Sequence, residues 1–192
     1  MVFNGNNYSE EWAGEAARRG LPIKNRTVEA VEALIAPKNI ALFERHGIFT
    51  EAECRARYEI LLEQYVKTVS IEEATMIEMV RRQILPAALR YTGSLAGEYT
   101  RMREAGVESA TAKALLETCA ALTDAVQQKT DALEASSRSV QKLEELPVQA
   151  TAYRDEIIPQ MQAIREDVDR LETMTEDGAW PMPSYTDLLH RV

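Results

Sequence analysis

The chain has 192 residues, which is enough for one domain with a substantial apolar core. Apolar residues make up 45% of it and charged residues 28%, which is the balance of a globular protein and excludes a disordered one. Acidic residues outnumber basic ones by 31 to 22, and this net charge of −9 argues against binding to nucleic acid or to an anionic membrane surface. Apolar runs are short, so no segment is predicted to span a membrane.

The first 47 residues are predicted to form three short helical pieces. Ser9 is the expected N-cap of the first piece, and Thr27 is the expected N-cap of the second. Pro37 occupies a first-turn position for the third piece, which we expect to end at Gly47. Pieces of this length typically lie across a larger body.

A much longer helix is predicted from Thr50 to about Glu104. Thr50 and Glu53 have the spacing of a capping box, and Gly106 supplies a C-terminal stop. Pro86 is expected to kink this helix, because its ring removes one backbone donor and clashes with the preceding turn. The apolar residues follow the helical period: Ile77, Val80, Ile84, Ala88, Tyr91, Leu95, Tyr99 and Met102.

A helical hairpin is predicted to follow. Ser109 can cap a helix that runs to about Leu146, and Pro147 allows only a short connection before the chain turns back. Pro159 is expected to bend or restart the returning helix. The spacing of four and three residues typical of helix-to-helix seams runs through Leu115, Cys119, Leu122, Val126, Lys129, Leu133, Ser136, Val140 and Leu143, and then through Ile157, Met161, Ile164, Val168 and Leu171.

These elements predict an all-α fold, in which a long kinked helix and an antiparallel helical hairpin form an elongated bundle. We divide the chain into short helices over residues 1–47, the bundle over residues 48–178 and an extended tail over residues 179–192. The tail contains Trp180 and Tyr185 and is expected to pack back on the domain.

The sequence contains no recognisable catalytic, cofactor-binding or metal-binding constellation. Glycine-rich phosphate loops are absent, and neither His46 nor His190 has a second ligand at metal-binding spacing. Cys54 and Cys119 lie far apart and are interpreted as small buried thiols in a reducing compartment. No secretory signal pattern opens the chain, so we expect a cytoplasmic protein.

Two adjacent acids are the most interesting polar residues. Glu72 lies in register with Val69 and Met76, and Glu73 lies in register with Val66 and Ile77, so one or both are expected to be partly buried. A buried carboxyl group with a raised pKa could act as a general acid or a ligand. The alternative, which we favour, is an ion pair with an arginine of a neighbouring helix.

Three stretches of the chain resemble the type III glutamine synthetases, in the region that follows their catalytic domain. The resemblance covers residues 3–95 and 178–190, whereas residues 106–176 agree only as a helical hairpin. The stretches are Phe3-Asn4-Gly5-Asn6-Asn7-Tyr8-Ser9-Glu10-Glu11-Trp12, then Lys38-Asn39-Ile40-Ala41-Leu42-Phe43-Glu44 with its continuation through Ile84-Leu85-Pro86-Ala87, and Trp180-Pro181-Met182-Pro183-Ser184-Tyr185-Thr186-Asp187-Leu188-Leu189. The family's tail tends to end in an aromatic residue after the two leucines, where this chain has His190.

The resemblance implies a parent enzyme that joins ammonia to glutamate, uses ATP and Mg²⁺ or Mn²⁺, and assembles into ring-based oligomers. None of the family's metal, nucleotide or substrate residues maps onto this chain. We therefore expect a C-terminal part that is inactive alone and serves a structural or oligomer-organising role. Its partners would be the catalytic domain of the same chain, contacted through Phe3, Tyr8 and Trp12, and neighbouring subunits.

Two other functions remain open from the sequence. One is a free-standing helical scaffold or adaptor that binds partner helices through an exposed seam. The other is a regulatory module that binds a small effector near Glu72 and Glu73.

Overall fold

The structure is a computed structural model that describes residues 4–6 and 8–190. The described part is helical and contains no strand, which confirms the predicted all-α class. The chain divides into two compact units, residues 1–65 and residues 66–192, and the boundary falls inside a long helix. The predicted division at residues 47 and 178 stays a prediction.

Unit 1 consists of short helices and the beginning of a long one. The elements are α1 (Glu10–Arg18), α2 (Thr27–Val31), a 3₁₀ turn (Glu32–Ile35), α3 (Pro37–Arg45) and the first half of α4 (Glu51–Met79). Pro37 begins α3 as predicted, and Gly47 follows its end with a left-handed φ of 62°. The predicted cap at Thr27 is wrong by one residue, because Arg26 holds the extended N-cap position and Thr27 is already helical.

The capping interactions of unit 1 follow the sequence only in part. Ser9 has the N-cap position of α1, but its hydroxyl donates to the Asn6 carbonyl at 2.7 Å and caps no backbone N–H. The predicted capping box of α4 is confirmed. The Thr50 N–H donates to Glu53 Oε2 at 2.8 Å, and the Glu53 N–H donates back to Thr50 Oγ1 at 3.3 Å.

The core of unit 1 is small, and several large apolar side chains lie outside it. Its buried apolar residues are Ala16, Val28, Val31, Ile40, Cys54 and Leu62. Phe43 and Phe49 pack edge to face at 5.7 Å, and the Arg57 guanidinium lies 4.3 Å from the centre of the Phe49 ring. Tyr8, in contrast, is 98% exposed.

The helix predicted over residues 50–104 is interrupted just before its proline. α4 ends at Met79, a π-helical turn covers Val80–Ile84, and α5 (Leu85–Glu104) then runs to the predicted end. The prediction placed the interruption at Pro86 itself. The irregular hydrogen bonding lies earlier, in the π-helical turn that contains Arg82, four residues before the proline. Because the proline ring clashes with the carbonyl of that residue and has no N–H to donate, widening the turn accommodates it.

The same device recurs in the second half of the hairpin. α7 (Leu146–Ala152) leads into a π-helical turn (Tyr153–Ile157), and α8 (Ile158–Met174) resumes with Pro159 in its first turn. In both places the proline is the second residue of the new α-helix. The two prolines therefore explain both π-helical turns.

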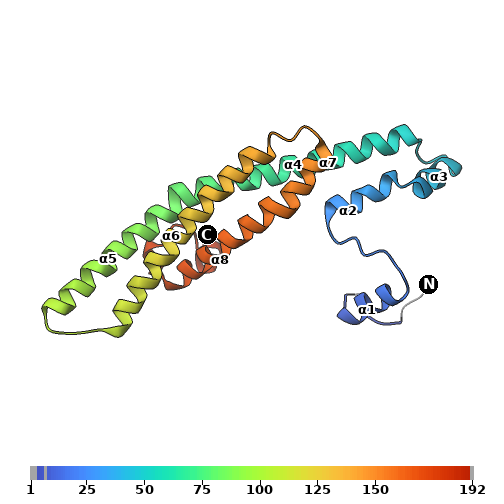
Figure 1. The fold of residues 1–192 in the computed structure, drawn as a ribbon. Coiled ribbons are helices and arrows are strands. Elements are labelled where there is room, and N and C mark those ends of the chain that lie inside the picture. The colour runs from blue at the N-terminus through green and yellow to red at the C-terminus, as the bar shows by residue number, and fades with distance from the viewer. Residues whose placement is uncertain (1–3, 7, 191–192) are drawn as a thin grey trace. The chain divides into compact units, whose positions relative to one another are not determined.

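Helix α6 (Ala110–Val140) is the centre of unit 2. It packs against α5 on one side and α8 on the other, and Figure 1 shows the three helices running alongside each other. The Ser109 hydroxyl accepts from the Ala112 N–H at 3.2 Å, so the predicted cap is confirmed. The helix ends at Val140, six residues before the predicted Leu146, and Leu146 begins the next helix. Its buried apolar residues match the predicted seam: Cys119, Leu122, Val126, Leu133 and Val140.

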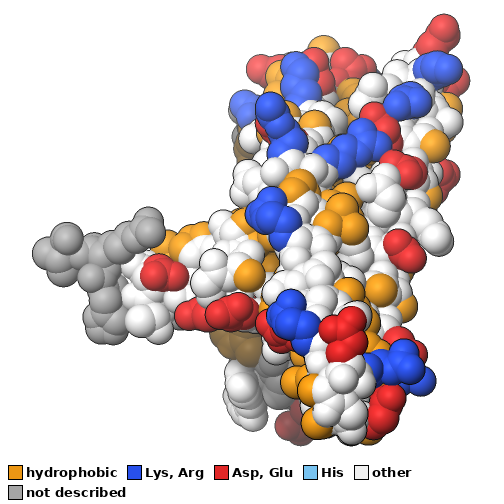
Figure 2. All heavy atoms as spheres, turned by 90° about the vertical axis from the view of Figure 1, so that its left-hand side faces the viewer, with side chains coloured by type: hydrophobic (Ala, Val, Ile, Leu, Met, Phe, Trp, Pro, Cys, Tyr) orange, Lys and Arg blue, Asp and Glu red, His pale blue; other side chains and the backbone are white. Residues whose placement is uncertain are grey.

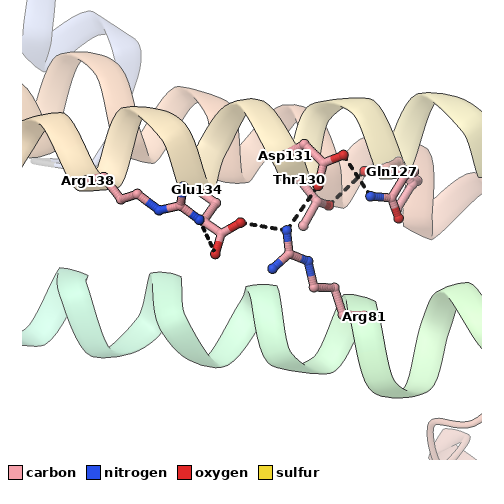
Figure 3. A network of polar contacts seen from close by, with 7 residues as sticks. Arg81, Gln127, Thr130, Asp131, Glu134 and Arg138 are labelled. Carbon is pink, nitrogen blue, oxygen red and sulfur yellow. Dashed lines mark hydrogen bonds and ion pairs between the residues drawn. The ribbon is translucent and has the colours of Figure 1, made fainter.

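A polar network joins the π-helical turn after α4 to the outer face of α6. Arg81 donates from one nitrogen to Asp131 Oδ1 at 3.0 Å and to Glu134 Oε2 at 2.6 Å, as drawn in Figure 3. Arg138 approaches the other oxygen of Glu134 at 2.9 Å. The hydrogen bond from Arg81 is the main cause that lowers the pKa of Glu134. These exposed contacts favour one longitudinal alignment of the two helices.

The tail begins with a 3₁₀ turn (Asp177–Ala179) and ends in α9 (Tyr185–His190). Ser184 and Asp187 form a capping box at the start of α9, with the Ser184 N–H donating to Asp187 Oδ2 at 2.9 Å. Trp180 is half-buried, whereas Leu188 and Leu189 are exposed. Figure 2 shows the end of unit 2 that carries the turn between α5 and α6, where side chains of both charge signs are intermixed.

Among the residues that the structure describes, no helix combines the length and the apolar character that crossing a bilayer requires.

The seam of α6 generates a stability prediction. Leu133 is fully buried, so the substitution Leu133→Ala should lower the free energy of unfolding by about 2–5 kcal/mol through lost burial and the cavity that remains. Leu89 on α5 is 61% exposed, and Leu89→Ala should change stability by less than about 0.5 kcal/mol. Urea unfolding followed by circular dichroism measures both. Equal effects of the two variants would contradict the predicted packing.

Candidate functional site

The most unusual polar group of unit 2 is the carboxyl group of Glu73 on α4. The side chain of Glu73 is 2% exposed, and its Oε2 atom has no hydrogen-bond partner among the described residues. Burial raises the pKa of Glu73, and a hydrogen bond from the Ser137 hydroxyl opposes this only in part. The expected burial is therefore confirmed for Glu73, and its raised pKa belongs to the alternative that the sequence did not favour.

The predicted ion pair is wrong for this residue. Ser137, the partner of Glu73, comes from α6, and no arginine contact to Glu73 is found within the described part of the chain. The arginines near this part of α4 reach outward instead, as Arg81 does toward Asp131 and Glu134. Burial without a cation favours the neutral, protonated carboxyl group.

Glu73 belongs to a chain of polar side chains from three helical segments. Gln141, just beyond α6, donates from Nε2 to the Ser137 hydroxyl at 3.0 Å. The Tyr153 hydroxyl makes hydrogen bonds with the side chains of Gln141 and Ser70, and the Tyr153 side chain is 1% exposed. Burial is the main cause that raises the pKa of Tyr153. The chain thus links α4, the end of α6 and the second π-helical turn through uncharged groups.

A second, partly buried polar contact joins the middle of α6 to α8. Lys129 Nζ donates to Asp167 Oδ2 at 2.5 Å and to the Ala163 carbonyl at 3.0 Å. Asp167 is 8% exposed, and Lys129 is the cation that it contacts. The position of Lys129 within an otherwise apolar seam is explained by this ion pair.

Glu72 occupies a different environment from its neighbour. Glu72 is exposed and lies at the rim of an open apolar groove of about 420 Å³ between α4 and α8. Ile71, Met76 and Met79 line the α4 side, and Met161 and Val168 line the α8 side. Arg165 stands on the rim across from Glu72. The two adjacent acids therefore separate into one buried in the bundle and one at a surface groove.

The other candidate residues are scattered through the fold. Cys54 is buried in unit 1 and Cys119 is buried in unit 2, both as free thiols, and burial raises the pKa of Cys119. His46 is exposed at the C-terminal end of α3, whereas the side chain of His190 lies outside the described residues. The described part of the chain holds no group of three or more His, Cys, Asp or Glu side chains arranged to bind a metal ion.

The chemistry available to the Glu73 cluster is therefore limited. A neutral carboxyl group, a serine, a glutamine and a tyrosine can exchange hydrogen bonds and hold a proton. No group of described residues fits a Mg²⁺ or Mn²⁺ site. The arrangement is that of a structural network whose members hold three helical segments in one alignment.

Sequence reasoning found Glu73 but missed most of its partners. Ser137 lies one position from Ser136, which the heptad pattern had assigned to the seam, and both serines carry structural contacts. Gln141 and Tyr153 carried no signal, because their contacts depend on the hairpin turn and on a π-helical turn. The groove between α4 and α8 was also missed.

Comparison with known proteins identifies relatives of the chain. Residues 1–103 match the family described as glutamine synthetase C-terminal domain. The chain is 31% identical over 195 residues to a glutamine synthetase of Butyrivibrio fibrisolvens and 31% identical over 193 residues to one of Bacteroides fragilis (strain YCH46). A type-3 glutamine synthetase of Dictyostelium discoideum is 29% identical over 195 residues.

These alignments cover 97% or 98% of this chain but only 26% or 27% of each relative. The chain therefore spans about a quarter of the length of these curated relatives, and it matches their C-terminal part. The resemblance inferred from the three sequence stretches is confirmed.

The burial of Glu73 generates a prediction about pH. Burial raises the pKa of the Glu73 carboxyl group in the folded state above its value in the unfolded chain. The protonated carboxyl group therefore contributes its full stability at low pH. That contribution is lost as the pH rises through the raised pKa. Substitution Glu73→Gln removes the titration, so the stability of the variant relative to the unsubstituted chain should increase from about pH 5 to about pH 8.

The adjacent residue supplies the matched control. Glu72 is exposed, so the stability of Glu72→Gln relative to the unsubstituted chain should change little over the same range. Urea unfolding at a series of pH values measures both differences. A flat difference for Glu73→Gln would contradict the neutral buried carboxyl.

Proposed function

The chain belongs to the glutamine synthetase C-terminal domain family, and from this premise we propose that it is a structural, non-catalytic domain of a type III glutamine synthetase. The parent reaction would be the ATP-dependent ligation of ammonia to glutamate, which gives glutamine. In this proposal, the residues that bind ATP, Mg²⁺ or Mn²⁺ and the substrates belong to the catalytic part of the parent protein. The domain would organise contacts with that part and with neighbouring subunits in the cytoplasm.

The distribution of apolar side chains supports this role. In unit 2 the seam residues of α6 are used in contacts between helices, and the buried polar groups serve hydrogen bonds within the bundle. No described cluster resembles a nucleophile beside a base or a metal site. The helices of unit 2 are thus suited to holding a shape.

Unit 1 carries the observation on which the proposal rests. Tyr8 is 98% exposed, and a large aromatic side chain in full contact with water is a frequent feature of a surface that another protein covers. Trp12 is half-buried, and Phe3 lies outside the described residues. Other large apolar residues of unit 1 are also exposed: Ile23, Leu42, Ile48 and Ile60. We propose that the catalytic part of the parent protein covers this apolar set.

The relatives favour this role over a free-standing adaptor. Each of the three is a glutamine synthetase about four times as long as the matched region, as the coverage of 26% or 27% implies. An adaptor would need no such catalytic companion.

The exposed tyrosine generates a prediction for the parent protein. In the longer glutamine synthetase that carries this chain, Tyr8→Ser should weaken the attachment of the domain by about 1–2 kcal/mol, because an aromatic anchor is lost. We expect a lower melting temperature, faster proteolysis near residue 8 and reduced ligation activity after dilution.

Leu89→Ser is the matched control, because Leu89 is a large exposed side chain of unit 2. That variant should retain the melting temperature, the proteolysis rate and the activity of the unsubstituted protein. If Tyr8→Ser behaved in the same way as Leu89→Ser in all three measurements, the proposed docking surface would be wrong.

A further inference from the structure

The apolar groove of unit 2 has no occupant within the described chain. Its floor is formed by buried side chains such as Val80 and Ile164, and its walls are α4 and α8. The groove is open along its length, whereas small-molecule sites usually enclose most of the ligand surface. An extended, partly apolar protein surface is the kind of occupant that this form fits.

We propose that this groove is a self-complementary docking surface on which a second copy of the same chain packs about a two-fold axis. The proposal rests on the proposed structural role, and it names one surface through which neighbouring subunits would meet. Three properties of the groove carry it: its charges, its protruding side chain and its methionines.

The charges on the two walls are complementary to each other. Glu72 stands on the α4 wall and makes no hydrogen bond or ion pair that the described residues reveal. Arg165 stands on the α8 wall, is 68% exposed and has only a 3.5 Å contact with Asp169. Under a two-fold axis, residue i of one copy meets residue j of the other, and j meets i. Glu72 and Arg165 would therefore form two equivalent ion pairs between copies.

The shape of the same surface is also self-complementary. Ile71 lines the groove yet is 66% exposed, so the surface contains a protruding apolar side chain beside an apolar hollow. A two-fold contact would insert each Ile71 into the groove of the other copy. Met76, Met79 and Met161 line the walls, and the flexible methionine side chain adapts to an incoming apolar group.

The test measures self-association of the chain by sedimentation equilibrium over a concentration series. We expect a monomer–dimer equilibrium. Either Glu72→Arg or Arg165→Glu alone should weaken dimerisation by about tenfold or more, because each places like charges opposite each other twice per dimer.

A mixture of the two single variants is the decisive measurement. Across a two-fold axis, the Glu72→Arg copy offers two cations to the two anions of the Arg165→Glu copy. The mixture should therefore form heterodimers more tightly than either variant forms homodimers alone. A contact within one chain could not produce this rescue.

Lys113→Glu is the control, because Lys113 carries an exposed charge on α6 outside the groove. It should dimerise like the unsubstituted chain, and circular dichroism should show that all variants are helical. Ile71→Asp, which acts on the protruding side chain, should abolish dimerisation independently of the charge pairs.

Three results would overturn the proposal. One is a chain that stays monomeric at the highest soluble concentration, and another is a mixture of the two charge variants that shows no heterodimer. The third is a melting temperature that rises with glutamine or ATP and loses this response in Met76→Glu, since the groove would then hold a small ligand. None of these results would contradict the proposed docking surface around Tyr8, because that surface is tested separately on the parent protein.

Discussion

Helix α6 is the element on which the structure of unit 2 depends. Its buried face contacts α5 on one side and α8 on the other, so removing it would leave those helices without their principal partner. The apolar residues of the seam supply most of the driving force, since each fully buried leucine or valine side chain contributes about 1.5–3 kcal/mol. The polar contacts of the unit are arranged around this seam.

Buried polar groups add alignment to that apolar packing. Lys129 crosses from α6 to Asp167 on α8, and Ser137 reaches Glu73 on α4. Each contact is satisfied only when the helices have one longitudinal position, because a shift of one turn would separate the partners. The outer network of Arg81 with Asp131 and Glu134 favours the same alignment from the solvent side. This combination supports the proposed structural role.

The sequence predicted the helices well and the polar contacts poorly, for physical reasons. Helices and their apolar seams follow from local periodicity, so the burial of Leu133 and the C-terminal end of α5 could be predicted. The hydrogen-bond partner of Glu73 could not be predicted. The burial of a residue follows from the period of its own helix, whereas its partner depends on how two helices are rotated relative to each other. The π-helical turn at Val80–Ile84 also shifts the helical register, and Leu85 and Ala87 are buried beside the predicted Ile84 and Ala88. The charged residues Glu72 and Arg165 line the same groove only because of tertiary packing.

Hydrogen exchange of backbone amides in the native chain tests most directly whether α6 holds unit 2 together. If the account is right, the amides of α6 near Leu133 exchange only through global unfolding and are the slowest in the chain, while those of α1 exchange much faster. Amides of α6 that exchanged as fast as those of α1, or faster than those of both α5 and α8, would contradict it.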